Sequence, residues 1–322
     1  MLTDFGDGIH VVDSRFFRPR LDAIHLIVEH GRVAIVDTGV NDSVPHVLQA
    51  LADLGLGLDS VDWVVLTHVH LDHAGGAGEL MRRLPRARLL VHPRGARHMI
   101  DPSRLMAGTI AVYGEDVARQ MYGDIPPVPA ERVVEAPDGF AIELNGRRLE
   151  AIDTPGHARH HLCLVDRKSG FVFAGDTFGL SYRELDQGER QFVVSSTTPV
   201  QFDPPALHAS IDRIVALRPK AVCLTHYGPV RDVPRLAADL HRQIDAMVAM
   251  AGECARRAAG RDDPEGSMLR ACLRDGMRDL IFDEARRQGW TADEAELQRI
   301  FTLDIGLNAD GLAAWLSGSA AA

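Results

Sequence analysis

Short runs of apolar, mostly β-branched or aromatic residues recur through the first two-thirds of the chain, and turn residues separate them. Runs of this length predict β-strands. The expected strands are 8–13, 23–28, 32–36, 61–66, 87–92, 132–135, 148–153, 162–165, 171–174 and 220–225. Segments with helical spacing stand between them, at 43–54, 79–84 and 204–217. Strands that alternate with helices predict an α/β fold.

Two stretches, residues 100–129 and 178–203, interrupt this pattern. The first carries Met106, Met121 and Tyr122 at spacing that is helical only in part. Methionine and tyrosine suit the wall of an adaptable apolar pocket or a packed lid. Ordinary core packing is the favoured interpretation.

The pattern changes after residue 231 and becomes helical. Leu236, Leu240 and Ile244 form one apolar stripe, and a second helix is expected to open at Asp263-Pro264. Further predicted features are a capping box at Thr291–Glu294 and a short last helix at 312–316. We therefore expect a main domain at 1–231 and a C-terminal helical region at 232–322 that packs on it. This region can stabilise the main domain, mediate dimerisation of the protein or shape the access of substrate to the site.

Composition narrows the class of protein. The 322 residues are 46% hydrophobic and 25% charged, as in soluble globular proteins. The net charge is −10 and no run of Lys and Arg occurs, which argues against a nucleic-acid partner. No apolar run is long enough to span a membrane, and the first residues do not resemble a signal peptide.

The cysteines form no CxxC pair, so we expect four reduced thiols and a cytoplasmic protein. They are Cys163, Cys223, Cys254 and Cys272.

A histidine-rich turn, residues 67–76, follows the expected strand 61–66. It contains His68, His70, Asp72 and His73. Alternate residues of an extended chain point the same way, so the first two histidines can aim at one point. His73 breaks the alternation and suits a second point. Imidazole and carboxylate ligands without thiolates favour zinc, manganese or iron.

Four other residues with ligand-type side chains end apolar strands in the same way: Asp37, His157, Asp176 and His226. Each alone could be structural, and Asp37 serves equally well as a helix cap or as the acceptor for a ligating histidine. Strand ends that all carry His or Asp favour one common site.

With these motifs the sequence resembles the metallo-β-lactamase superfamily over roughly residues 8–230. The resemblance rests on Asp37-Thr-Gly39, Thr67-His-Val-His-Leu-Asp-His-Ala-Gly-Gly76, Thr154-Pro-Gly-His157, Gly175-Asp-Thr177 and His226. It implies an αββα sandwich, with two sheets back to back, helices outside and metals at one edge. The chain would add a C-terminal helical extension to that fold.

The resemblance also implies a dinuclear centre with seven ligands. The first ion would be held by His68, His70 and His157, the second by Asp72, His73 and His226, and Asp176 would bridge them. Asp37 would support a ligand. The expected cofactors are two divalent metal ions, with zinc favoured and iron or manganese as alternatives.

His226 stands where some β-lactamases use Cys, which argues against antibiotic hydrolysis. The motifs look closest to glyoxalase II-like thioesterases. Lactonases of the superfamily typically carry a Tyr where this chain has Gly179, although Tyr182 or Tyr227 could substitute.

We therefore expect a hydrolase in which a metal-bridging hydroxide attacks a thioester, ester or lactone carbonyl. Asp72 would orient this hydroxide and carry a proton, and His161 would assist near the substrate or support a ligand. A small-molecule substrate is expected, with no nucleic-acid or membrane partner and a homodimer as an option. The alternatives are a di-iron redox or oxygen-binding protein and a non-catalytic metabolite-binding regulator.

Overall fold

The computed structural model describes residues 2–197, 201–259 and 266–318. Contacts between Cα atoms divide the chain into two units. Unit 1 comprises Met1–Thr154, His160–Gly175 and Pro219–Arg231, and unit 2 comprises Pro155–Arg159, Asp176–Arg218 and Asp232–Ala322. In the sequence, Pro155–Arg159 and Asp176–Arg218 of unit 2 stand between segments of unit 1. The division expected from the sequence, with a boundary after residue 231, stays a prediction.

Unit 1 contains two β-sheets. Within the described residues, sheet A has seven strands in the order β1 to β7. They are β1 (Leu2–Asp4), β2 (Ile9–Asp13), β3 (Ala23–Glu29), β4 (Arg32–Val36), β5 (Val61–Val65), β6 (Arg88–Val91) and β7 (Val133–Glu135). The strands from β1 to β4 pair antiparallel, and those from β4 to β7 pair parallel.

Sheet B has six strands in the described parts of the chain, in the order β13-β12-β11-β10-β9-β8. They are β8 (Ala141–Leu144), β9 (Arg147–Asp153), β10 (Leu162–Asp166), β11 (Phe171–Gly175), β12 (Ala221–Leu224) and β13 (Gly228–Val230). Only β11 and β12 pair parallel in this sheet; the other neighbours are antiparallel.

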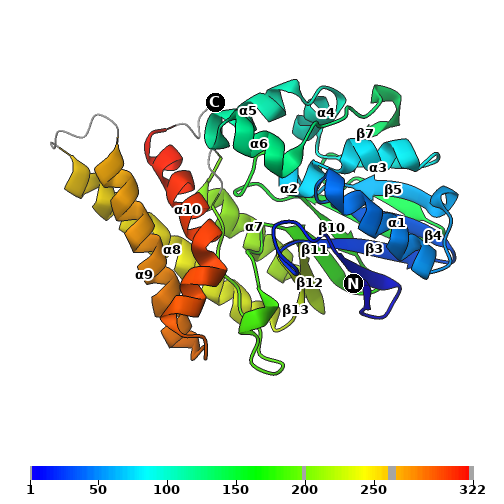
Figure 1. Ribbon diagram of the computed structural model, residues 1–322. Helices are drawn as coiled ribbons and strands as arrows, with labels where there is room; N and C mark the ends of the chain where they lie inside the picture. Colours follow the sequence, from blue (N-terminus) through cyan, green and yellow to red (C-terminus); the bar gives the residue numbers. More distant parts are fainter. Residues whose placement is uncertain (1, 198–200, 260–265, 319–322) are drawn as a thin grey trace. The chain divides into compact units, whose positions relative to one another are not determined.

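Helices cover one face of sheet A, as Figure 1 shows for α1 and α3. The α-helices of unit 1 are α1 (Val44–Asp53), α2 (Leu71–Ala74), α3 (Ala77–Arg83), α4 (Pro93–Ile100), α5 (Ser103–Tyr113) and α6 (Glu115–Tyr122). Short 3-10 turns are η1 (Asn41–Ser43), η2 (Leu58–Ser60) and η3 (Ala130–Arg132). Val47 and Leu80 belong to the core between these helices and the sheet.

The opposite face of sheet A packs on sheet B through a second core. Ile27 and Val65 from sheet A and Leu164 and Phe173 from sheet B are buried there. The central strands of sheet A are thus covered on both faces, which explains why they read as continuous apolar runs rather than alternating ones.

The pairing register brings the expected site residues to the carboxyl ends of two strand pairs, β4 with β5 and β11 with β12. Val36 at the end of β4 pairs with Val65 at the end of β5, so Asp37 and the histidine turn emerge side by side. In sheet B, Gly175 pairs with Leu224, and Asp176 and His226 follow at that end. Carboxyl ends of parallel strands are the usual place for chemistry in α/β proteins.

Unit 2 holds η4 (Arg183–Leu185), α7 (Pro204–Ala216), α8 (Val233–Ala258), α9 (Ser267–Gln288) and α10 (Glu294–Leu316). Helix α9 packs against both α8 and α10 (Figure 1). The stripe predicted on α8 is confirmed, because Leu236, Leu240 and Ile244 are buried. No helix among the described residues is long and apolar enough to cross a membrane.

Three expectations for this helical region need comment. Helix α10 begins after Asp293, whose carboxylate accepts a hydrogen bond from the Glu296 amide, so the capping box at Thr291 is wrong. The separate last helix at 312–316 is also wrong, because these residues continue α10. The expected helix start at Asp263-Pro264 lies outside the described residues.

The expectation of four reduced thiols is wrong for one pair. Cys254 on α8 and Cys272 on α9 form a disulfide, with their Cα atoms 5.7 Å apart. The packing of α8 on α9 places these two positions opposite each other. Cys163 and Cys223 are buried free thiols.

Candidate metal centre

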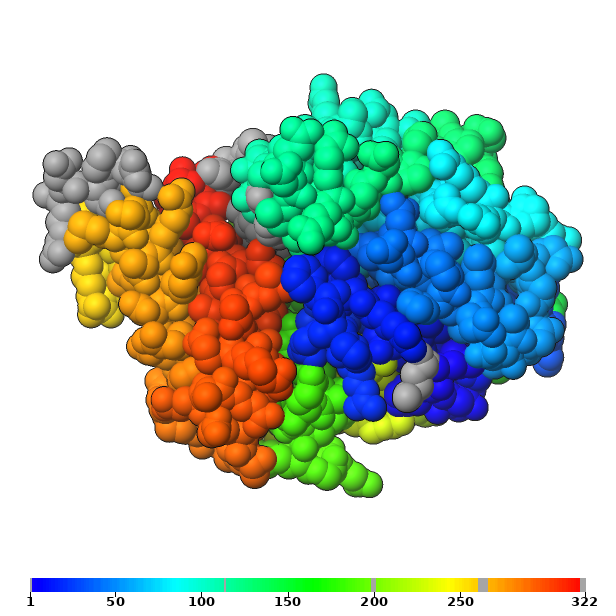
Figure 2. All heavy atoms as spheres, viewed as in Figure 1, coloured from blue at the N-terminus to red at the C-terminus, as the bar shows by residue number. Residues whose placement is uncertain are grey.

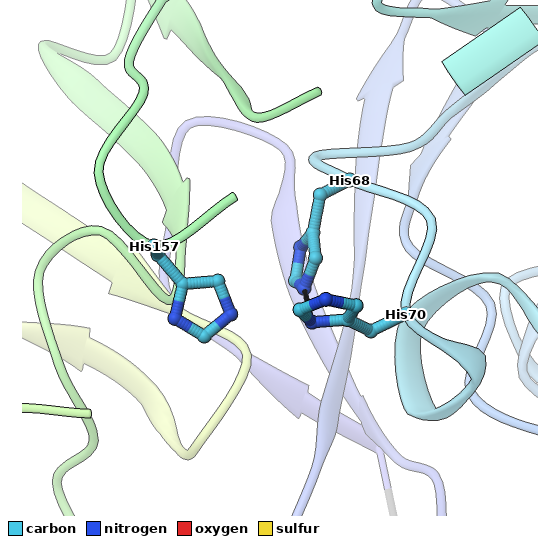
Figure 3. A group of neighbouring side chains, drawn as sticks. All are labelled: His68, His70 and His157. Carbon is cyan, nitrogen blue, oxygen red and sulfur yellow. Dashed lines mark hydrogen bonds between the residues drawn. The ribbon is translucent and has the colours of Figure 1, made fainter. Parts of the chain in front are cut away.

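The histidine turn leaves β5 in extended conformation and becomes α2 after His70, which is the N-cap residue of that helix. Nε2 of His68 lies 2.8 Å from Nδ1 of His70. Figure 3 shows that the His68 and His70 rings meet through these two nitrogens, with the ring planes at 83° to each other. The extended segment therefore aims the first two histidines at one point, as alternation predicts.

Among the described residues of unit 1, one group of side chains offers ligand atoms that lie within 4.8 Å of one another, and it consists of Asp72, His73 and His226. Of the other predicted ligands, His68 and His70 also belong to unit 1, and His157 and Asp176 belong to unit 2. These seven side chains are the ones for which the sequence predicts ligand roles.

The group of Asp72, His73 and His226 lies entirely in unit 1. Oδ2 of Asp72 is 3.5 Å from Nε2 of His73 and 3.5 Å from Nε2 of His226. Zinc bonds of about 2.0–2.2 Å in a tetrahedral site put neighbouring ligand atoms roughly 3.3–3.6 Å apart. The donor types and their separations therefore fit a divalent metal ion.

Asp37 contacts His73 at Nδ1, the ring nitrogen that faces away from Asp72. Its carboxylate accepts hydrogen bonds from Nδ1 of His73 at 2.9 Å, from the Thr67 amide at 2.8 Å and from the Thr225 hydroxyl at 2.7 Å. Burial acts to raise the pKa of Asp37, but His73 and these hydrogen bonds outweigh it, so the pKa lies below its ordinary value. The bond to Nδ1 turns Nε2 of His73 toward Asp72.

Asp22 stands behind His226 in the same way, and sequence reasoning did not single it out. Its Oδ1 lies 2.7 Å from Nδ1 of His226, and the Asp22 side chain is fully buried. Burial raises the pKa of Asp22, although His226 acts in the opposite direction. In the sequence, an acidic residue just before an apolar strand looks the same whether it supports a ligating histidine or only marks the start of the strand.

Two threonines were also missed, although the sequence holds a signal for them. Thr67 precedes His68 and Thr225 precedes His226, so the same Thr-His pair follows both β5 and β12. Both threonine hydroxyls donate to the Asp37 carboxylate. The repeated dipeptide therefore connects two strand ends to one buried acid.

His157 and Asp176 contact each other in unit 2, with Nε2 of His157 at 3.3 Å from Oδ2 of Asp176.

Gly175, the last residue of β11, has φ of +46°, and a Cβ there would lie 2.6 Å from the Thr67 hydroxyl and 2.7 Å from Nε2 of His161. Only glycine fits at this position.

The remaining candidate residues are buried. The His161 ring is fully buried with Nδ1 2.9 Å from the Thr154 hydroxyl. The Tyr182 hydroxyl donates to Asp304 at 2.9 Å, and Tyr227 packs with Val11 and Ala23. Their roles toward a substrate stay predictions.

The fold and these ligand groups define an α/β protein with a divalent metal centre at the ends of its strands. The chain belongs to the metallo-β-lactamase superfamily, whose family model matches residues 19–226. The predicted fold class is confirmed, since the solved structures of similar fold are metallo-β-lactamase fold proteins.

Three relatives illustrate the range of similarity. A metallo-β-lactamase fold-containing protein of Sulfurisphaera tokodaii, ST1585, is 30% identical over 66% of this chain and 75% of its own length. Its crystal structure has a TM-score of 0.62 and 23% identity, and it covers 96% of this chain and 99% of that one.

The other two relatives are named as enzymes. A hydroxyacylglutathione hydrolase of Synechococcus is 32% identical over 54% of this chain and 55% of its own. The acyl-coenzyme A thioesterase MBLAC2 of Gallus gallus is 30% identical over 53% of this chain and 63% of its own. The chain thus spans less than two-thirds of the length of both. Superfamily and relatives together indicate a metal-binding hydrolase.

Proposed function

We propose that the protein is a dinuclear metal-dependent hydrolase that cleaves a thioester, ester or lactone. The observation that carries the proposal is the convergence of Asp72, His73 and His226, with Asp37 and Asp22 behind the two histidines. Carboxylates that orient ligating imidazoles are a feature of metal centres, and their burial here makes a merely solvated cluster a poor explanation.

His73 and Asp72 differ in their exposure to solvent, and we propose different roles for them. His73 is fully buried, whereas the Asp72 side chain is 25% exposed. Two divalent ions at this centre would supply an activated water and polarise the scissile carbonyl. We assign to Asp72, at the solvent side of the group, the role of accepting the proton of the attacking water and returning it to the leaving group.

An apolar cluster adjoins the histidine turn and supports an apolar substrate group. Leu71, between His70 and Asp72, packs in this cluster with Val40 and Tyr122. Partly buried side chains pack against these three: Phe16, Leu105, Met106, Met121 and Ile125. The rings of Phe16 and Tyr122 stack at 5.7 Å, and in Figure 2 the blue N-terminal segment adjoins the blue-green helices α5 and α6.

The names of two relatives favour a thioester over an ester or a lactone. Zinc is the proposed metal, because the 3.5 Å separations among Asp72, His73 and His226 fit tetrahedral zinc, and the same imidazole and carboxylate ligands leave iron and manganese as alternatives. We further propose a small-molecule substrate, since a net charge of −10 is unsuited to nucleic acid.

The test is a panel of thioesters, lactones and carboxylic esters with the metal-loaded protein. At least one class should be hydrolysed, and Asp72→Ala should lose turnover while it keeps the circular dichroism spectrum. Asp59→Ala, on the distant turn η2, is the matched control and should retain activity. Absence of turnover across the panel, or an active Asp72→Ala protein, would overturn the proposal. Iron with an oxygen-sensitive visible spectrum would favour the redox alternative.

A further inference from the structure

Two histidines outside the metal centre meet on neighbouring helices of unit 2. His208 lies on α7 and His241 on α8. Their Nδ1 atoms are 2.5 Å apart, their ring planes differ by 14°, and their ring centroids are 4.8 Å apart.

The two nitrogens point directly at each other. The centroid separation exceeds the Nδ1–Nδ1 separation by about one ring diameter, so both nitrogens lie on the line between the ring centres. An imidazole nitrogen carries its lone pair or its proton in the ring plane. The rings therefore meet edge to edge through Nδ1, and face stacking does not explain the contact.

A carboxylate lies at the far nitrogen of each ring. Nε2 of His208 is 3.2 Å from Oδ1 of Asp245, and Nε2 of His241 is 3.1 Å from Oδ1 of Asp212. Each helix thus contributes a His and, four residues later, an Asp, and the pairs are made crosswise between the helices. A carboxylate fixes the proton of a neutral imidazole on the nitrogen that faces it.

With both protons on Nε2, two Nδ1 lone pairs face each other, and this arrangement requires a cation between them. The candidate metal centre also contains two imidazole nitrogens close together, with Nε2 of His68 2.8 Å from Nδ1 of His70. We infer that His208 and His241 bind a transition-metal ion of the zinc, nickel or copper class, which links α7 to α8.

The surroundings suit such an ion. Imidazole nitrogens favour these metals over magnesium or calcium. The His208 and His241 side chains are 27% and 28% exposed, so the rings can separate to admit an ion and water can complete its coordination. Asp212 and Asp245 would orient the ligands, as carboxylates behind ligating histidines do.

The test is a calorimetric titration of zinc-loaded full-length protein with further Zn²⁺. We expect binding of one additional ion per chain, which His208→Gln and His241→Gln should each abolish. Asp245→Asn, which keeps the histidine pair, should weaken this additional binding by about 10–100-fold. His30→Gln is the matched control, because His30 is a 74% exposed histidine beside a carboxylate but without a second histidine. It should leave the additional binding unchanged.

Two results would overturn the inference. The first is wild-type protein that binds no zinc beyond its metal centre, with one NMR-detected proton shared by the two rings. The second is a His208→Gln and His241→Gln double variant that binds the additional ion as wild type does. Either result would mean that the two histidines share a proton or only pack against each other at the surface, without binding a metal ion.

Discussion

Replacing Asp37 by Asn tests how the strand ends hold the metal centre. The two side chains have the same shape, but Asn has no charge and carries a donor where Asp has an acceptor. Asp37 accepts from the Thr67 amide on one oxygen and from His73 and Thr225 on the other. Whichever way the Asn amide turns, at least one buried donor then faces another donor.

The magnitude follows from these contacts. A hydrogen bond to a charged acceptor contributes about 1.5–3 kcal/mol, and a buried donor without an acceptor costs about 1–3 kcal/mol. The lowered pKa of Asp37 indicates that its contacts outweigh its burial. We expect Asp37→Asn to lose about 3 kcal/mol in the free energy of unfolding. Its metal affinity should fall about 10–100-fold, because Nδ1 of His73 is no longer held.

Two measurements check this prediction. Denaturant unfolding of metal-free protein gives the stability, and competition with a chromophoric chelator gives the metal affinity. Thr225→Val is the control, since it removes one donor to Asp37 and leaves the contact with His73. It should lower stability by about 1.5 kcal/mol, the lower end of this range, and leave metal affinity within a few-fold of wild type. Unchanged stability and metal affinity in Asp37→Asn would show that the Asp37 carboxylate does not orient His73.

Three further predictions concern other parts of the chain. Gly175→Ala would place a Cβ 2.6 Å from the Thr67 hydroxyl, so soluble yield and bound metal, measured by elemental analysis, should both fall; unchanged metal content would contradict the close approach. Burial lowers the pKa of His25 to about 4, so the unfolded chain binds the extra proton first. Stability should be complete above about pH 6.5 and decline by up to about 3 kcal/mol toward pH 4, with a smaller slope in His25→Gln; an equal slope in both proteins would contradict it. Reduction of Cys254–Cys272, which closes a loop with a sequence separation of 18, should lower the stability of unit 2 by about 3 kcal/mol in denaturant titrations with and without reductant; coincident curves would contradict the bond.

Local patterns were sufficient for the main strands and for the residues that end them. The strands β4, β10, β11 and β12 are largely apolar runs, and Asp37 and Asp176 directly follow β4 and β11, so sequence neighbours carry most of the signal there. The short strands β1, β8 and β13 escaped because three or four residues with mixed polarity form no periodic pattern. The loosened stretch 100–129 contains helices α5 and α6, which Gly114 and Gly123 end before a long period develops.

Contacts between distant segments could not be predicted. Asp22 and His226 lie at opposite ends of unit 1 in sequence and meet because β2, β3 and the turn after β12 fold together. The Cys254–Cys272 bond depends on how α8 packs on α9, and the spacing of the cysteines alone does not reveal it. The crosswise His-Asp pairs of α7 and α8 have the same origin, since neither helix contains both partners of a pair.

We propose that hydrolysis by this protein requires its metal centre. The most direct test strips metal from the full-length protein with a chelator and follows hydrolysis of the preferred substrate during stepwise addition of Zn²⁺. Stripped protein should be inactive, and activity should return and level off near two ions per chain. Full turnover by the stripped protein, or no recovery of turnover after the centre is filled, would contradict metal-dependent hydrolysis.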